Sequence, residues 1–214
     1  MGPCYYPGEW DMAKASLDFY FDFASTYSYL AALRIGPLSE AAGVDVHWRP
    51  ILLGPIFAAR GLTTSPFAAD PEKGRHMWRD MERLAARHGL PAVVKPPVMP
   101  ANSLLAARVA VCLNEASRPA FSREIFHRAF ARGQDIGEPE VVRQALAGLG
   151  HFSEDVMEAA QAQANKDRLR AQTDAARAAG VFGAPTFICA DGELFWGHDR
   201  LEMALEHAAM SARR

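Results

Sequence analysis

Segments with the pattern of strands occur only near the two ends of this chain, and this arrangement limits its possible folds more than any other feature. Residues 17–23, LDFYFDF, are rich in aromatic side chains and predict a buried strand. Residues 44–49, VDVHWR, alternate apolar and polar side chains and predict a second strand. A helix is expected between them, so the order favours a parallel pair joined by a right-handed crossover.

The first helix is expected to begin near Ser25 and to end at Gly43. Its apolar side chains recur at helical spacing from Tyr27 onward. Gly36-Pro37 is expected to interrupt or kink it, because proline cannot donate the helical hydrogen bond. Glycine is the usual residue where a helix ends in a left-handed conformation, which favours Gly43 as the end.

The middle of the chain has no strand pattern. Residues 50–70 contain several prolines and glycines and little periodicity, so they predict a long loop, and loops of this length are often functional. From residue 71 to 179 the periodicity is helical, with prolines and glycines between the segments. The predicted helices cover residues 73–88, 103–116, 118–131, 138–149 and 153–179.

Strand character returns at residues 185–189 and 193–196, and the Asp191-Gly192 turn between them predicts a hairpin. A last helix is expected over residues 199–210, with Asp199 as its cap and Glu202 completing a capping box. The order predicts an α/β protein: a thioredoxin-like fold with a large all-helical domain inserted after the first βαβ unit.

This order divides the chain into three parts. Residues 1–16 are expected to be a flexible extension. Residues 17–70 and 180–214 would form the thioredoxin-like domain, and residues 71–179 the inserted helical domain.

Charge and cysteine content narrow the possible partners and the compartment. The 23 basic and 25 acidic residues give a net charge of -2, which argues against nucleic acid and against an acidic membrane surface. No uncharged run approaches the roughly 18 apolar residues of a membrane span. The three cysteines form no CxxC pair, and residues 1–16 lack the pattern of a signal peptide. We therefore expect a cytoplasmic protein.

Three segments together resemble one family: FDFASTYSYLA at residues 21–31, GVFGAPTFI at 180–188 and WGHDRLEMAL at 196–205. They are similar to the 2-hydroxychromene-2-carboxylate isomerases and the kappa-class glutathione transferases, which have a DsbA-like thioredoxin fold. The resemblance covers residues 17 to about 210. It implies glutathione as cofactor, a small aromatic or bicyclic substrate, a role in the degradation of aromatic compounds, and a homodimer.

The residue that carries the chemistry in this resemblance is Ser25, which stands where thiol oxidoreductases have the first cysteine of CxxC. Disulfide exchange needs a thiolate, so the absence of cysteine at this position excludes a disulfide oxidoreductase. A hydroxyl at a helix start favours an anion, and the family uses it to hold the glutathione thiolate. The alternative is that Ser25 is an ordinary helix cap, and both roles can coexist.

The energies suffice for that role. A free thiol is mostly protonated at neutral pH. Lowering its pKa by about two units makes it mostly ionised and corresponds to roughly 2.7 kcal/mol of differential stabilisation. A charge-assisted hydrogen bond supplies about 1.5–3 kcal/mol, and the helix start adds about 0.3–1 kcal/mol. No lysine or metal is needed.

The resemblance also assigns cofactor-binding residues in the C-terminal segments. Ala184 would pair with the cysteinyl unit of glutathione because Pro185 is expected to be cis, whereas a trans proline opening an edge strand is the alternative. Gly197 and His198 would offer backbone N–H groups to the γ-glutamyl carboxylate, and Asp199 would bind its ammonium group. Arg200 would bind a carboxylate or contact another subunit. The alternative to these ligand-binding roles is that Asp199 only caps the helix and that Arg200 is only a charge on the surface.

The residues that could contact the substrate are fewer than those assigned to the cofactor, and the sequence supports them less strongly. Phe57, Phe67 and Trp78 could line an aromatic pocket, or simply belong to the core. Asn102 resembles a substrate-side position of the isomerases. Lys73 and Arg75 are interpreted as solvated charges. The histidines lack the spacing of metal ligands, so we expect no metal site.

Three functions remain open. The first is a glutathione-dependent isomerase in which the thiolate, activated by Ser25, adds reversibly to the substrate. The second is a kappa-like transferase that conjugates glutathione to electrophiles. The third is a non-catalytic thioredoxin-fold protein that binds extended peptides over Pro185.

Overall fold

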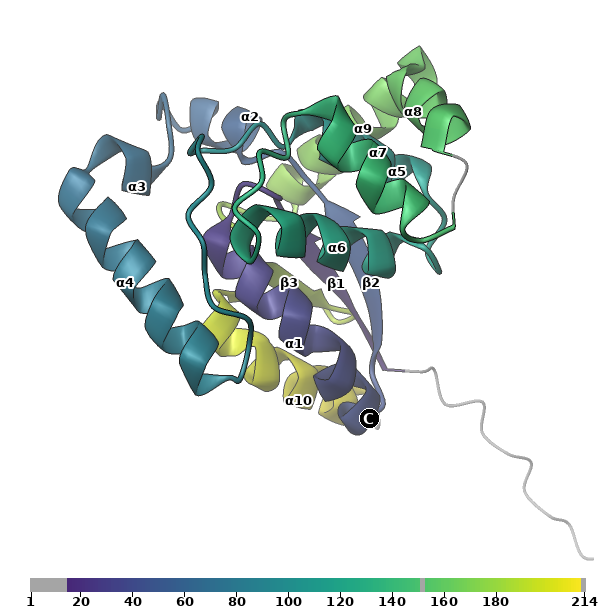
Figure 1. Ribbon diagram of the computed structural model, residues 1–214. Coiled ribbons are helices and arrows are strands. Elements are labelled where there is room, and N and C mark those ends of the chain that lie inside the picture. The colour runs from purple at the N-terminus through teal and green to yellow at the C-terminus, as the bar shows by residue number, and fades with distance from the viewer. Residues whose placement is uncertain (1–14, 151–152, 213–214) are drawn as a thin grey trace, which may run out of the picture.

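The computed structural model describes residues 15–150 and 153–212. Within them the strands form a mixed sheet in the order β2-β1-β3-β4 (Figure 1). β1 (Ser16–Phe21) pairs in parallel with β2 (Asp45–Pro50) and antiparallel with β3 (Thr186–Cys189), which pairs antiparallel with β4 (Leu194–Trp196). Residues 1–14 of the expected extension lie outside the described residues, and its last residue already belongs to β1.

β1 lies inside the sheet, between β2 and β3, and every second side chain along it is buried. Leu17, Phe19 and Phe21 are each at most 1% exposed. The Phe19 ring stacks on Phe187 at 5.4 Å and meets the edge of Trp48 at 5.0 Å, so one aromatic residue joins three strands. The predicted buried aromatic strand is confirmed.

Helices surround this sheet. α1 (Thr26–Ala42) packs against α6 (Arg118–Phe130) and against α10 (Leu201–Ser211), which follows the short 3-10 turn η1 (His198–Arg200). Figure 1 shows α3 and α4 at the left edge, α5, α7, α8 and α9 at the upper right, and α6 near the centre. The remaining helices are α2 (Leu53–Ala58), α3 (Pro66–Ala69), α4 (Pro71–Arg87), α5 (Leu104–Cys112), α7 (Pro139–Ala147), α8 (Ser153–Gln161) and α9 (Gln163–Ala178).

The helical block and the sheet share a hydrophobic core. Phe126 of α6 lies 5.8 Å from Phe21 of β1 and 5.0 Å from Phe23, ring centre to ring centre. All three side chains are fully buried. The α/β class and the thioredoxin-like order with a helical insertion are confirmed, and the inserted helices help to bury the first strand.

Several local predictions were wrong. The expected interruption at Gly36-Pro37 does not occur: α1 continues to Ala42 with Pro37 inside it, because burial of the helix between neighbours outweighs one missing hydrogen bond. The alternative, a kink at this proline, stays a prediction. The region 50–70 contains α2 and α3 instead of being loop throughout. The expected single helix over 153–179 is divided at Ala162, whose extended backbone separates α8 from α9. The predicted end of α1 at Gly43 is confirmed by its φ of 66°.

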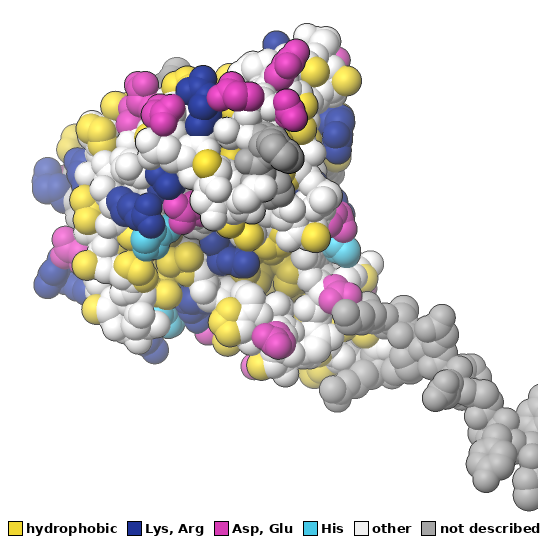
Figure 2. All heavy atoms as spheres, turned by 45° about the vertical axis from the view of Figure 1, so that its right-hand side comes forward, with side chains coloured by type: hydrophobic (Ala, Val, Ile, Leu, Met, Phe, Trp, Pro, Cys, Tyr) yellow, Lys and Arg dark blue, Asp and Glu magenta, His cyan; other side chains and the backbone are white. Residues whose placement is uncertain are grey.

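The surface carries charges of both signs. On the face drawn in Figure 2, Lys and Arg lie interspersed with Asp and Glu, so no extended basic area is visible there. None of the helices in the described part of the chain is long and apolar enough to cross a bilayer.

Candidate active site

Ser25 lies at the start of α1 and joins two distant parts of the chain. Its Oγ accepts a hydrogen bond from the Ser28 N–H at 3.1 Å, which makes it the cap of the helix. The same hydroxyl donates to the carbonyl oxygen of Ala184 at 3.0 Å, 159 residues away in sequence. The peptide bond from Ala184 to Pro185 is cis, as predicted. The helix start and the residue before the proline therefore face each other.

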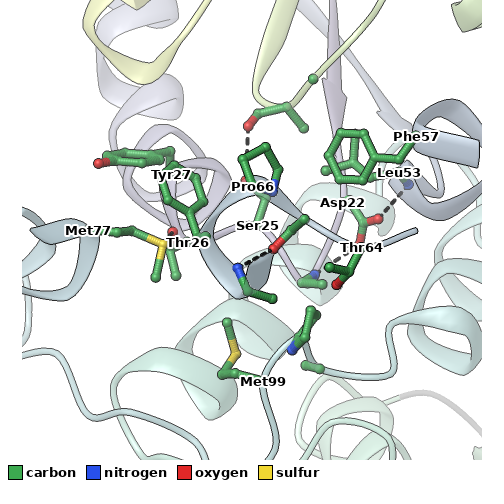
Figure 3. A pocket seen from close by; sticks show the side chains of 18 of the residues that line it. Asp22, Ser25, Thr26, Tyr27, Leu53, Phe57, Thr64, Pro66, Met77 and Met99 are labelled. Carbon is green, nitrogen blue, oxygen red and sulfur yellow. Dashed lines mark hydrogen bonds between the residues drawn. The ribbon is translucent and has the colours of Figure 1, made fainter. Parts of the chain in front are cut away.

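A cavity of about 1430 Å³ opens beside Ser25. Figure 3 shows Ser25 near its centre, with Thr26, Tyr27 and Met77 on one side and Asp22, Leu53 and Phe57 on the other. Every residue selected from the sequence lines this cavity, namely Ser25, Phe57, Phe67, Trp78, Asn102, Ala184, Pro185, Gly197, His198, Asp199 and Arg200. The structure thus brings all the candidate positions together.

The segment after β4 turns sharply toward the start of α1. Gly197 has a φ of 110°, and a Cβ there would lie 2.5 Å from Asp199 Oδ1, so only glycine fits without strain. The buried His198 ring stacks on Tyr27, with centroids 5.3 Å apart and planes 5° apart. Burial lowers the pKa of His198 and favours its neutral form.

The predicted capping box at the last helix was wrong. Gly197 precedes the 3-10 turn, and no side chain caps it. Asp199 lies inside the turn and pairs with Arg200 at 3.1 Å, and both side chains are at least half exposed. Glu202 instead pairs with Arg34 of α1. The capping-box prediction failed because the Glu202 carboxylate forms an ion pair with an arginine of another helix instead of capping its own helix.

Two further side chains shape this end of the cavity, and the sequence argument did not assign them a role. The Tyr27 hydroxyl donates to Asp80 Oδ2 of α4 at 2.9 Å, and burial together with this bond raises the pKa of Tyr27. Thr26 donates to the sulfur of Met77 at 3.2 Å, which attaches the first turn of α1 to α4. Tyr27 stands inside the first quoted motif, so the motif itself held the signal.

Asp22 is a third residue without a predicted role, and it directly follows β1. Its carboxylate accepts the N–H of Leu53 at 2.7 Å and that of Ala24 at 2.9 Å, and its carbonyl oxygen accepts the Ser25 N–H at 2.9 Å. Burial raises the pKa of Asp22, although the bonds from Leu53 and Ala24 oppose this. Asp22 therefore holds the turn that presents Ser25 and attaches α2 to it.

The candidate substrate residues line the cavity but also pack elsewhere. Phe67 lies 6.0 Å from Tyr27, ring to ring, and Trp78 lies 6.3 Å from the core residue Phe130. The Asn102 side chain accepts the N–H of Leu104 at 3.2 Å and so helps to begin α5. These residues combine packing with exposure to the cavity.

Lys73 and Arg75 are exposed on α4, as interpreted from the sequence, with partners on their own helix turn. Arg75 also lines the cavity.

A group of exposed side chains at the cavity was missed altogether. They are Arg60 from the turn after α2, Phe182 from the segment before the cis proline, and Trp196 from the end of β4. Phe182 and Trp196 stand inside the second and third quoted motifs but were given no role, and Arg60 lies outside all three motifs.

The described cysteines do not serve this site. Cys112 and Cys189 are free thiols, and neither lines the cavity. Burial raises the pKa of Cys189 to about 11, so its thiol stays protonated. Over residues 15–150 and 153–212, no three His, Cys, Asp or Glu side chains gather as metal ligands. The chemistry available at the cavity is that of hydroxyls, backbone groups and charged side chains.

Comparison with known proteins gives a consistent result. A profile of the DSBA-like thioredoxin domain matches residues 16–209. The 2-hydroxychromene-2-carboxylate isomerase of Pseudomonas putida is 31% identical over 199 residues, covering 87% of this chain and 91% of that protein. Glutathione S-transferase kappa 1 of Homo sapiens is 28% identical over 204 residues, 88% of each chain.

A solved structure of 2-hydroxychromene-2-carboxylate isomerase is similar along nearly its whole length. Its TM-score is 0.82 at 28% identity, and the match covers 92% of this chain and 96% of that one.

Proposed function

The chain belongs to the DsbA-like thioredoxin domain family, and we propose that it is a glutathione-dependent isomerase like its 2-hydroxychromene-2-carboxylate isomerase relatives. The resemblance seen in its three motifs is confirmed by relatives that are isomerases or kappa-class glutathione transferases. The observation that carries the proposal is the Ser25 hydroxyl at a helix start, bonded to Ala184 beside a cis proline.

The residues present fit the tripeptide. The first N–H groups of a helix have no intrahelical partners, so the start of α1 favours an anionic sulfur next to Ser25. Ala184 has a backbone carbonyl for the cysteinyl unit. The Gly197 N–H already donates to the Pro185 carbonyl oxygen at 3.0 Å, so His198 would offer its backbone N–H to the γ-glutamyl carboxylate. Asp199 is exposed beside them and can pair with the ammonium group.

The binding of glutathione would change the hydrogen bond that the Ser25 hydroxyl donates. In the structure its Oγ accepts the Ser28 N–H while its hydrogen goes to the Ala184 carbonyl. An amide N–H of a bound peptide that pairs with Ala184 would take this acceptor and release the hydroxyl hydrogen. The hydroxyl can rotate toward sulfur, and the bond from Ser28 strengthens it as a donor.

Glutathione, when bound, would supply a thiolate nucleophile for reversible addition to an unsaturated carbon of the substrate, which would allow rotation about the former double bond. Ser25 stabilises the anionic sulfur and does not itself form a bond to the substrate. Phe57, Phe67 and Trp78, which line the cavity, would contact the aromatic part of the substrate, together with Asn102.

The transferase activity of the kappa-class relatives is the second candidate, favoured by the same Ser25 geometry. The two differ in whether the new carbon–sulfur bond is kept. Recovery of unchanged glutathione with a rearranged substrate supports the isomerase, whereas accumulation of a conjugate supports the transferase. Absence of glutathione binding would leave the third function, a non-catalytic protein that binds extended peptides over Pro185.

A homodimer and a cytoplasmic location complete the proposal. Sedimentation of the purified chain tests the first, and localisation of a tagged chain tests the second.

A further inference from the structure

Two large aromatic side chains lie exposed against each other at the cavity. Phe182 is 38% exposed and Trp196 is 52% exposed, and their ring centres are 4.9 Å apart. The indole nitrogen of Trp196 lies 2.6 Å from where a Cβ on Gly183 would stand, so the indole lies close against this backbone. Exposed aromatic pairs lose favourable burial unless a ligand covers them.

A cation adjoins this pair. The guanidinium of Arg60 lies 5.6 Å from the centre of the Phe182 ring. Arg60 makes no ion pair within residues 15–150 and 153–212, so its charge is available to an anion. A guanidinium can bind a carboxylate through two parallel hydrogen bonds.

The same residues stand at the boundary of two cavities. Arg60 and Phe182 line the large cavity beside Ser25 and also a smaller one of about 440 Å³. Arg177 of α9 lines the smaller cavity too, although Asp174 at 3.5 Å balances part of its charge. Two cations, Arg60 and Arg177, therefore line the smaller cavity, and Arg60 lines the larger one as well.

The distance from Ser25 is short enough for one molecule to span. Phe182 precedes Ala184 by two residues, so their Cα atoms are at most about 7 Å apart. Ala184 is the hydrogen-bond partner of Ser25. A ligand with its reacting carbon near Ser25 can thus lay a flat ring system over Phe182.

From these observations we infer that Arg60, Phe182 and Trp196 form a distal substrate subsite. It takes an elongated, planar aromatic substrate that carries an acidic group at the end far from the reacting carbon. The aromatic pair supports the ring system, and Arg60, with Arg177 behind it, pairs with the acid. This inference rests on the proposed function, since it extends the substrate side of the same cavity.

Calorimetric titration of the full chain tests the inference with two matched probes, 2-naphthoate and the neutral 2-naphthamide. We expect the acid to bind about tenfold more tightly than the amide, the lower range of a charge-assisted hydrogen bond at an exposed site. Arg60→Gln should remove this preference, and Trp196→Ala should weaken both probes. Arg170→Gln, an exposed arginine of α9 away from both cavities, should behave as the wild type. Thermal unfolding of each variant establishes that it is folded.

Saturating glutathione separates the subsite from the cofactor site. We expect 2-naphthoate to bind equally well with and without the tripeptide. Displacement of the probe by glutathione, equal affinity for acid and amide, or an unchanged preference in Arg60→Gln would each overturn the inference. If glutathione fails to bind while the preference and its loss in Arg60→Gln hold, the proposed function is refuted and the subsite stands.

Discussion

Replacing Ser25 with alanine separates the structural role of this residue from its chemical role. The substitution removes the oxygen that caps α1 and the hydroxyl that bonds to Ala184. Loss of a cap costs about 1 kcal/mol of stability, and loss of a typical hydrogen bond about another 1 kcal/mol. We therefore expect the free energy of unfolding to fall by about 2 kcal/mol, a lowering of Tm by roughly 5 °C for a chain of this size.

The chemical effect should be larger than this structural one. A hydrogen bond to a charged group contributes about 1.5–3 kcal/mol. Its loss corresponds to a decrease of about 10- to 150-fold in the acid dissociation constant of the bound glutathione thiol. At neutral pH most of the thiolate would be lost, and turnover should fall by at least about tenfold.

The ultraviolet absorbance of the thiolate, recorded against pH on the glutathione complex, measures the dissociation constant directly. Ser28→Ala is the matched control, because Ser28 Oγ is buried without a hydrogen-bond partner in the described structure while its backbone N–H remains. This control should titrate like the wild type. Ser25→Thr keeps a hydroxyl and should recover much of the lost thiolate.

The reasoning about Ser25 would be refuted by a thiol that titrates identically in wild type and Ser25→Ala, with equal turnover. The helix start would then provide the anion site without the hydroxyl. A Ser25→Ala protein that is destabilised but titrates normally would leave Ser25 as a helix cap only.

Three further predictions concern other parts of the molecule. The hydrogen bond from His207 holds the pKa of Asp191 at about 2, below its ordinary value of 3.8. Asp191 therefore stabilises the fold above about pH 4, and the stability difference between wild type and Asp191→Asn in acid unfolding should shrink as the pH falls toward 2. Arg118→Met should cost about 3 kcal/mol in urea denaturation, because the buried guanidinium bonds to three backbone carbonyls that would lose their partner. Gly197→Ala should weaken glutathione binding in calorimetry, since the added Cβ collides with Asp199 and strains the turn; unchanged affinity would place the tripeptide elsewhere.

The order of the elements could be predicted because it depends on local signals, and the candidate residues that line the cavity could be predicted because the three motifs resemble a known family. Aromatic alternation marked β1, the Asp191-Gly192 turn marked the hairpin, and three motifs marked the segments that meet at Ser25. Gly192, with a φ of 89°, has the conformation that such a turn requires.

The failures came from contacts between residues far apart in sequence. Pro37 does not end α1, because the surrounding helices hold it. Glu202 does not complete the predicted capping box, because its carboxylate pairs with Arg34 on another helix. Arg60 and Phe182 come together only through the fold, so no spacing rule could have paired them.

The pairing of β1 with β3 has a consequence for how the chain is made. Leu17 has Cys189 as its partner, so the ribosome releases the first strand long before its neighbour on that side exists. Until then this aromatic edge is open to other chains, a known hazard of unpaired strands. A nascent chain that lacks residues 180–214 should therefore depend on a chaperone to avoid aggregation, and the last 35 residues act as the closing step of its assembly.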